Sequence, residues 1–317
     1  MTRLSTPRYS EVMTRKLSSS KVLVLGGSGF VGRHVCERLS WQGYTVTVPT
    51  RRLPARSVQM LPGVHVVQAD VHDPQQLQQL VHGQDAVINL VAILHGDEAS
   101  FDQVHVQLPR QLARACHSEH VHRLVHVSAL GADVHAPSMY QRSKARGELV
   151  LHAAADREGL AVTLLRPSVI FGKDDQFINL FAKLQALFPL MPLAGADTRF
   201  QPVWVQDVAQ AIVHAVNHHE TAGQVYELCG PDIVTLRELV QLAGRWAGHV
   251  RPVVGLPHAI GWLQALLMEF APGPTLMSRD NLASMQVHNV GTGHLPGLRS
   301  LGVTEPTRLQ RIFPPKH

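Results

Sequence analysis

A glycine-rich turn near the start of the chain constrains its fold more than any other feature. Residues 26–32 read GGSGFVG, between the apolar run 21–25 and a helix-like run at 33–39. The apolar run predicts a buried parallel strand, and the later run predicts a helix. A strand, a glycine-rich turn and a helix in this order form the context that a dinucleotide-binding site requires.

The glycines at every third position each meet a different steric need. Gly26 lets the chain turn sharply, Gly29 lets the backbone approach a pyrophosphate, and Gly32 lets the helix pack closely on the strand. The N–H groups of the first helical turn then face the anion. The residues expected to bind the cofactor here are Gly26, Ser28, Gly29, Phe30, Val31 and Gly32.

Strand-like and helix-like patterns alternate along the first half of the chain. The predicted strands are 21–26, 44–48, 64–68, 85–91, 123–128 and 162–166, and the predicted helices between them are 30–42, 74–82, 101–119 and 138–158. Regular alternation of this kind indicates an α/β fold, a Rossmann-type doubly wound parallel sheet with helices on both faces.

The spacing becomes irregular and prolines become frequent after residue 167. This change predicts a smaller C-terminal α/β lobe that holds the substrate at the carboxyl ends of the strands. We expect a disordered tail at 1–20, a nucleotide-binding domain at 21–167 and the smaller lobe at 168–317, with a core shared between the two.

Composition excludes several classes of function. The 317 residues are 45% hydrophobic and carry a net charge of +5 with a pI of about 9.4, but the basic residues are scattered. No basic stripe interleaved with aromatics is present, so nucleic-acid binding is not expected. Neither the three cysteines, Cys36, Cys116 and Cys229, nor the 20 histidines show metal-ligand spacing, so we predict no metal site and reduced thiols.

The N-terminal residues have a leader-like composition without the apolar core of a secretory signal. No apolar run reaches the ~18 residues of a membrane span. We therefore expect a cytoplasmic protein, and a peripheral position at the inner membrane stays open as the alternative.

Residues 256–270 are apolar on most faces of a predicted helix. Core packing is the favoured interpretation of this segment. The alternative is contact with a protein partner or a membrane surface, because large exposed apolar patches mark interaction sites.

Tyr140 and Lys144 are spaced to lie on one face of a helix. A lysine ammonium beside a phenol favours the phenolate, so we expect the pKa of Tyr140 to be lowered. Such a tyrosine passes a proton to or from a substrate oxygen while a nicotinamide passes a hydride. Ser128, at the end of the fifth strand, is expected to polarise the same oxygen. The predicted catalytic residues are Ser128, Tyr140 and Lys144.

The end of the second strand determines which nicotinamide nucleotide is preferred. NAD enzymes usually place an acid there for the ribose 2′-hydroxyl, whereas this chain has Arg51 and Arg52. An arginine offers a bidentate fork to a 2′-phosphate. NADP(H) is therefore favoured over NAD(H), the alternative being two merely solvated arginines.

Other residues expected at the cofactor follow the third, fourth and sixth strands. Asp70 is assigned to the adenine edge, because Asp73 before Pro74 is the better helix cap. Asn89 lies within a buried strand, where a ribose contact and a sheet-stabilising hydrogen bond are both open. The remaining predicted cofactor residues beside these strands are Val71, Leu90, Val91 and Pro167.

These motifs together resemble the extended and atypical short-chain dehydrogenase/reductases, which are epimerase/dehydratase-like. The resemblance covers roughly residues 21–290 and rests on GGSGFVG, Asp70, Tyr140, Lys144, LRPSVIFG at 165–172 and QPVWVQDVA at 201–209. Within the family the chain is most similar to the group around the accessory NADPH-binding subunit of respiratory complex I and its bacterial relatives, through VPTR at 48–51, SALGA at 128–132, APGP at 271–274 and SRDN at 278–281.

The resemblance implies a bound NADP(H), with Lys144 on the nicotinamide ribose. Family members usually carry two or three hydroxyl residues where this chain has Val127-Ser128-Ala129, a departure that bears on activity.

Three functions follow from the sequence. The first is NADP(H)-dependent oxidoreduction of a carbonyl or alcohol on an unknown small molecule. The second is sugar-nucleotide epimerisation or dehydration, for which Lys173, Arg199 and Arg237 are available donors without a recognisable motif. The third is a non-catalytic nucleotide-holding accessory or assembly subunit of a complex I-like electron-transfer system.

Overall fold

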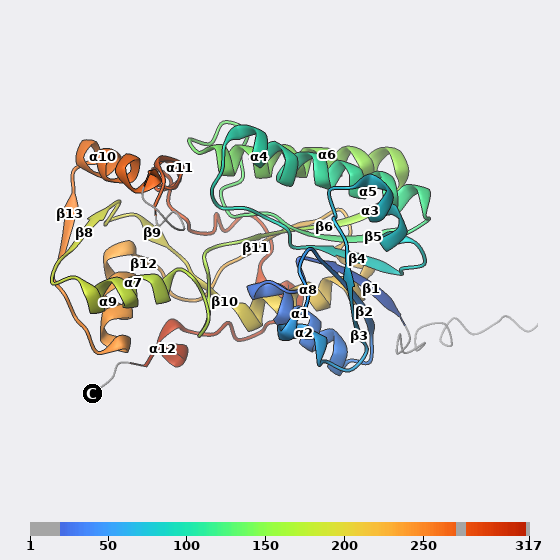
Figure 1. The fold of residues 1–317 in the computed structure, drawn as a ribbon, viewed down its shortest axis with the longest axis horizontal. Helices are drawn as coiled ribbons and strands as arrows, with labels where there is room; N and C mark the ends of the chain where they lie inside the picture. Colours follow the sequence, from blue (N-terminus) through green and yellow to red (C-terminus); the bar gives the residue numbers. More distant parts are fainter. Residues whose placement is uncertain (1–19, 271–276, 315–317) are drawn as a thin grey trace, which may run out of the picture.

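A computed structural model describes residues 20–270 and 277–314 and contains a seven-stranded parallel sheet (Figure 1). Its order is β11-β6-β5-β4-β1-β2-β3. The strands are β1 (Lys21–Leu25), β2 (Thr45–Thr50), β3 (Val64–Gln68), β4 (Ala86–Asn89), β5 (Arg123–Val127), β6 (Ala161–Pro167) and β11 (Val225–Leu228). The predicted doubly wound sheet is confirmed, and β11 is a seventh strand that the sequence reading did not identify.

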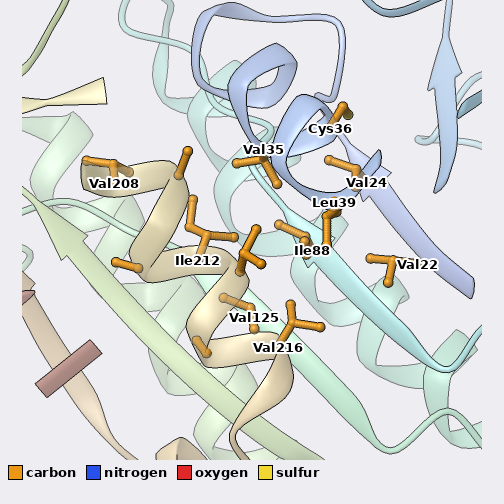
Figure 2. Close-up of a cluster of buried hydrophobic side chains, with 14 of the residues drawn as sticks. Val22, Val24, Val35, Cys36, Leu39, Ile88, Val125, Val208, Ile212 and Val216 are labelled. Atoms are coloured by element: carbon orange, nitrogen blue, oxygen red, sulfur yellow. The ribbon is translucent and has the colours of Figure 1, made fainter. Parts of the chain in front are cut away.

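The central strands carry buried apolar residues on both faces, which explains why they read as continuous hydrophobic runs. Val22 and Val24 of β1 join one buried cluster, whereas Leu23 and Leu25 join another on the opposite face. Helices α1 (Phe30–Trp41) and α8 (Val205–Asn217) cover the first face, as Figure 2 shows.

The second face of the sheet is covered by three helices. These are α3 (Pro74–Val81), α5 (Leu108–Ser118) and α6 (Met139–Glu158). The predicted helix 101–119 begins earlier, as α4 (Glu98–Asp102), and continues into α5 through a π-helical segment, Gln103–Gln107. A short helix, α2 (Arg56–Gln59), precedes β3.

The residues after 167 build a smaller lobe, at the left in Figure 1, and also return to the sheet. The lobe contains α7 (Ile178–Leu187), α9 (Leu236–Ala247), α10 (His258–Glu269), α11 (Arg279–Ser284) and α12 (Leu309–Ile312). Its paired strands are β7 (Ile170–Phe171) with β10 (Val203–Trp204), β8 (Met191–Ala194) with β13 (Val253–Leu256), and β9 (Arg199–Phe200) with β12 (Val234–Thr235). Between these elements, α8 and β11 belong to the layers of the large sheet.

The apolar segment 256–270 does not pack as predicted. In α10 only Gly261 and Ala265 are buried, whereas Leu267 is 64% exposed and Phe270, just after the helix, is 80% exposed. The helix packs through its small residues, because a Cβ on Gly261 would lie 2.6 Å from the Cβ of Ala194 in β8. The favoured interpretation of core packing is therefore wrong.

The predicted tail 1–20 lies outside the described residues except for Ser20, which is buried and whose carbonyl accepts a hydrogen bond from the Thr45 amide. The motif at 271–274 also lies outside them. Within the described part of the chain, no helix is long and apolar enough to cross a bilayer. All three cysteines are free thiols.

Candidate functional site

The glycine turn joins β1 to α1 with no room for side chains at two positions. Gly26 has a φ of +79°, which L residues rarely adopt, and a Cβ there would lie 3.2 Å from the Leu90 carbonyl carbon. A Cβ on Gly32 would lie 2.2 Å from the Gly26 carbonyl oxygen. The turn therefore contacts the residue that follows β4, and α1 begins within the glycine-rich segment itself.

The first turn of α1 is open to an anion. Its N-cap is Gly29, whose lack of a side chain leaves the first helical N–H groups without a capping partner, and the turn carries no acidic residue. Uncapped N–H groups and the helix dipole together favour a phosphate at this position. A Cβ on Gly29 would meet only the Gly26 carbonyl oxygen, at 3.2 Å, so the space in front of it is free of other protein atoms.

The predicted cofactor residues gather at one edge of the sheet, because they follow the carboxyl ends of strands that run parallel. The order changes direction between β1 and β4, at the position of the glycine turn. Arg51 and Arg52 follow β2 and are exposed, and Asp70, after β3, is also exposed. The partly exposed members are Ser28, Phe30, Val31, Val71, Leu90 and Val91.

Two predicted polar positions have defined local partners. Asp73 caps α3 by accepting hydrogen bonds from the amides of Gln75 and Gln76, as expected from the following Pro74. Asn89 is buried, accepts a hydrogen bond from the Val91 amide and pairs with His126 Nδ1 at 3.1 Å. Asn89 thus stabilises the ends of β4 and β5 by its own hydrogen bonds.

Tyr140 and Lys144 lie in the first turns of α6. Lys144 Nζ is buried and donates to the Val127 carbonyl at 3.0 Å, and its burial lowers the Lys144 pKa to about 8. Burial raises the pKa of Tyr140 to about 12, so the expected lowering is wrong. The reason is geometric: the lysine ammonium binds the end of β5 and leaves desolvation as the dominant influence on the phenol.

A histidine that the sequence reading missed packs against Tyr140. The rings of His105 and Tyr140 are 5.5 Å apart, and Phe101 lies 6.2 Å from the same tyrosine. His105 Nε2 accepts from the Ile93 amide, so Nδ1 carries the proton and donates to Ser143 Oγ at 2.8 Å. Ser143 in turn donates to the Tyr140 carbonyl.

His105 belongs to the π-helical segment before α5. Gly147 of α6 allows this segment to approach, because a Cβ there would lie 2.1 Å from the His105 carbonyl oxygen. π-Helical segments often occur at functional sites. The sequence offered only one sign of this role, a histidine between two valines in a predicted helix.

Two buried polar atoms at the end of β5, Ser128 Oγ and His126 Nε2, form no hydrogen bond with any residue that the structure describes. Buried polar groups normally find partners, so such atoms point to a ligand or an ordered water. Together with the uncapped turn of α1, they fit a polar group bound along this edge. The residues present therefore fit a dinucleotide and an oxygen-bearing substrate.

The segment around Pro167 holds α6 against the sheet. Arg166 pairs with Glu148 of α6 through Nε at 2.9 Å and Nη2 at 2.5 Å, which raises the Arg166 pKa. The Pro167 carbonyl accepts from the Leu130 amide, beside Ser128. The ion pair between Arg166 and Glu148 therefore fixes the helix that carries Tyr140 and Lys144.

A cavity of about 590 Å³ lies between the loop at 95–97, the start of α6, and α10 and α11 of the smaller lobe. Met139 and Trp262 are among its lining residues. Asp280 of α11 accepts hydrogen bonds from the Met139 and Tyr140 amides at 2.6 and 3.1 Å. The smaller lobe thus caps the first turn of the helix that carries the tyrosine, and the cavity opens beside that turn.

Comparison with known proteins assigns this architecture. Residues 22–229 match the NAD dependent epimerase/dehydratase family. The chain is 31% identical, over 90% of its length and 77% of the relative's, to NADH dehydrogenase [ubiquinone] 1 alpha subcomplex subunit 9, mitochondrial, of Mus musculus. It is 30% identical to the ceramide reductase of Caulobacter vibrioides, over 61% of this chain and 59% of that protein.

Solved structures share the fold. An epimerase from Methanothermobacter thermautotrophicus aligns with a TM-score of 0.75 at 17% identity, over 94% of this chain and 91% of that one. A dTDP-glucose 4,6-dehydratase from Streptomyces venezuelae, solved with NAD bound, aligns with a TM-score of 0.66 at 25% identity, over 75% and 85%. The chain belongs to the NAD dependent epimerase/dehydratase family, among the extended short-chain dehydrogenase/reductases.

Proposed function

We propose that the protein transfers a hydride between NADP(H) and a carbonyl or alcohol substrate, with Tyr140 as the acid/base. The hydrogen bond from Lys144 Nζ to the Val127 carbonyl carries this proposal. It holds the Tyr140 helix against the end of β5, where the Ser128 hydroxyl is buried and forms no hydrogen bond within residues 20–270 and 277–314. A substrate oxygen between Ser128 and Tyr140 would supply that partner.

The charge states favour the reductive direction. With a pKa of about 12, Tyr140 keeps its proton at neutral pH and is ready to donate it to a carbonyl oxygen. Lys144, with a pKa of about 8, remains mostly charged at pH 7 and donates to the Val127 carbonyl, which holds the Tyr140 helix at the end of β5. A bound nicotinamide supplies the hydride. The ceramide reductase among the relatives is named for a reduction as well.

Two arginines support the choice of NADP(H). Arg51 and Arg52 follow β2 at the position from which an acid would bind an unphosphorylated ribose. Both are exposed, and among residues 20–270 and 277–314 neither forms an ion pair within 4 Å. We propose that one or both bind the 2′-phosphate.

A nucleotide-holding accessory role is the second candidate. The similarity to the alpha subcomplex subunit of Mus musculus over 90% of this chain favours it. In this role Lys144 and the glycine turn would still bind the nucleotide, whereas the Tyr140 hydroxyl would be dispensable. Sugar-nucleotide chemistry has less support, because Arg237 already donates to the Val253 carbonyl and pairs with Asp197.

We also propose that the protein works in the cytoplasm, at the face of the inner membrane, with a partner contacting residues 256–270. The exposed apolar side chains of α10 support a partner on this helix. Burial raises the pKa of all three free cysteines to about 12, which keeps them protonated and unreactive in a reducing compartment.

The substitution Tyr140→Phe separates the enzyme from the accessory subunit. NADPH-loaded protein is mixed with a deproteinised metabolite extract, and nicotinamide fluorescence is followed. We expect the wild type to consume NADPH and Tyr140→Phe to lose about 100-fold or more of that rate, the usual contribution of a general acid. Tyr226→Phe, in β11, is the matched control and should keep the rate.

The dissociation constant for NADPH should be unchanged in Tyr140→Phe, which shows that the nucleotide site is intact. Equal rates in the wild type and Tyr140→Phe would reject Tyr140 as the acid. A wild type that holds NADPH unchanged throughout would favour the accessory role.

A further inference from the structure

The exposed side of α10 carries a continuous stripe of large apolar side chains. Ile260, Leu263, Leu267 and Phe270 follow one another at spacings of three and four residues, which places them on one side of the helix. They are 55%, 52%, 64% and 80% exposed, respectively. The opposite side, with Gly261 and Ala265, is the side that packs on β8.

The stripe continues onto neighbouring elements of the same lobe. Pro192 of β8 is exposed and its carbonyl accepts a hydrogen bond from Gln264 of α10. Val254 in the adjacent β13 is 46% exposed. Beyond β8, the end of α7 exposes Leu187, and the segment that follows it exposes Phe188 and Leu190. In Figure 1, α10, β13, β8 and α7 follow one another along the end of the molecule away from the large sheet.

We name this surface, from Leu187 through Val254 to Phe270, the apolar end. Monomeric proteins rarely expose contiguous apolar areas of this kind without a partner. A 12-residue helix is too short to span a bilayer, so α10 can only lie along a surface.

The charges around the apolar end select the partner. Residues 178–194 and 239–270 contain three lysines or arginines, Lys183, Arg245 and Arg251, and one acid, Glu269. Glu269 is bonded to Arg279 at 2.9 Å, so it is neutralised within the lobe. Lys183 and Arg245 are exposed. These cations lie on α7, on α9 and before β13, outside α10 itself, and the net positive charge that they give this part of the lobe favours an anionic surface.

A second copy of the chain fits this surface less well. In a two-fold symmetric dimer the same patch faces itself, so two surfaces of the same net positive charge would meet. An anionic surface has the opposite charge. Trp262, which is 42% exposed at the edge of the stripe, is the side chain that membrane interfaces favour.

We propose that the apolar end docks on the surface of an anionic lipid bilayer, with the α10 stripe inserted among the acyl chains and Lys183, Arg245 and Arg251 near the headgroups. The proposal rests on the peripheral location proposed above and is independent of hydride transfer. Trp262 and Glu269 of α10 also line the 590 Å³ cavity beside Met139. Docking would therefore bring the mouth of that cavity close to the membrane.

Vesicle co-sedimentation of the full chain tests the proposal. The vesicles are phosphatidylcholine alone, or phosphatidylcholine with phosphatidylglycerol at roughly three to one, an anionic surface. We expect binding to the anionic vesicles, weaker binding to the neutral ones, and weaker anionic binding for Lys183→Gln with Arg245→Gln. Leu263→Glu with Leu267→Glu should weaken binding by about 100-fold, because each leucine contributes about tenfold or more when buried.

The matched control is Leu149→Glu with Met60→Glu, two side chains 57% and 88% exposed outside the apolar end. It should bind vesicles like the wild type. Circular dichroism and the NADPH dissociation constant of each variant should be unchanged, since none of these residues contributes to the nucleotide edge.

Wild-type protein that stays in the supernatant with both kinds of vesicle would overturn the proposal. Equal losses of vesicle binding in the Leu263/Leu267 variant and in the control variant would overturn it as well. Light scattering that shows a wild-type dimer split by Leu263→Glu with Leu267→Glu would assign the apolar end to a second copy instead. If the wild type does not bind NADPH, the proposed hydride transfer is rejected, but the result of the vesicle experiment still holds.

Discussion

At the scale of single residues, the site is a set of titratable groups kept out of water. His105 and His126 are both buried, and burial with the neighbouring Lys144 lowers their pKa values to about 2 and about 3. Both imidazoles are therefore neutral at pH 7 and act as fixed hydrogen-bonding groups. They hold Tyr140 and Asn89 in place.

These histidines predict a specific loss of stability in acid. In the unfolded chain they bind protons below about pH 6.5, whereas in the folded protein they stay neutral until about pH 3. The unfolded state therefore takes up more protons, and the free energy of unfolding falls as the pH drops below 6.5. Each histidine contributes a slope of up to about 1.4 kcal/mol per pH unit.

Urea unfolding of the wild type and His126→Asn between pH 7 and pH 5 measures this slope. We expect the variant to show a shallower dependence, because it loses one of the two histidines, and the control His65→Gln, at an exposed position in β3, to match the wild type. Identical slopes in the wild type and His126→Asn would contradict the assignment.

At the scale of elements, one glycine of the turn is needed for folding and another leaves space for a ligand. Gly32 is required for α1 to lie on the turn, since its Cβ would clash with backbone at 2.2 Å. A Cβ on Gly29 would meet only one backbone oxygen, at 3.2 Å, so folding does not require a glycine there. The absence of a side chain instead leaves the space in front of the helix open. The two glycines therefore have different roles despite their shared spacing.

Alanine substitutions should separate these roles. Gly32→Ala should unfold the protein or lower its melting temperature strongly, because the clash is with rigid backbone. Gly29→Ala should remain folded and lose at least about tenfold in NADPH affinity, because the methyl group occupies the approach of the pyrophosphate. Thermal unfolding and NADPH titration measure the two effects. The opposite assignment, with Gly29→Ala unfolded and Gly32→Ala binding normally, would refute this account of the turn.

The elements also show where sequence reasoning works. The six predicted strands were confirmed because strands covered on both faces are continuous apolar runs, and the turn and proline signals between them are local. β11 was missed because Glu227 interrupts its four residues and its partner β6 lies about 60 residues earlier. For α10, an apolar composition did not reveal that the helix docks through Gly261 and Ala265.

In the site, the residues that follow strands could be predicted because parallel strands bring their carboxyl ends to one edge. The contacts of side chains could not. The pKa of Tyr140 depends on Lys144 turning to Val127, and the role of His105 depends on a π-helical segment that has no local sequence signal.

At the scale of the whole molecule, the smaller lobe is joined to both ends of the nucleotide site. Arg33, one residue beyond the glycine turn, pairs with Asp174 of the loop after β7 at 2.7 Å. On the other side, Asp280 caps the helix of Tyr140. The lobe therefore contacts both the helix that follows the glycine turn and the helix that carries Tyr140.

Titration of the purified protein with NADPH and with NADH, followed by nicotinamide fluorescence, tests the central claim most directly. We predict saturable binding of both, with NADPH at least about tenfold tighter, as a bidentate arginine–phosphate contact provides. The preference should disappear in Arg51→Ala with Arg52→Ala and persist in Arg56→Ala, an exposed arginine of α2. Failure to bind either nucleotide, or a preference for NADPH that survives the double substitution, would contradict the account.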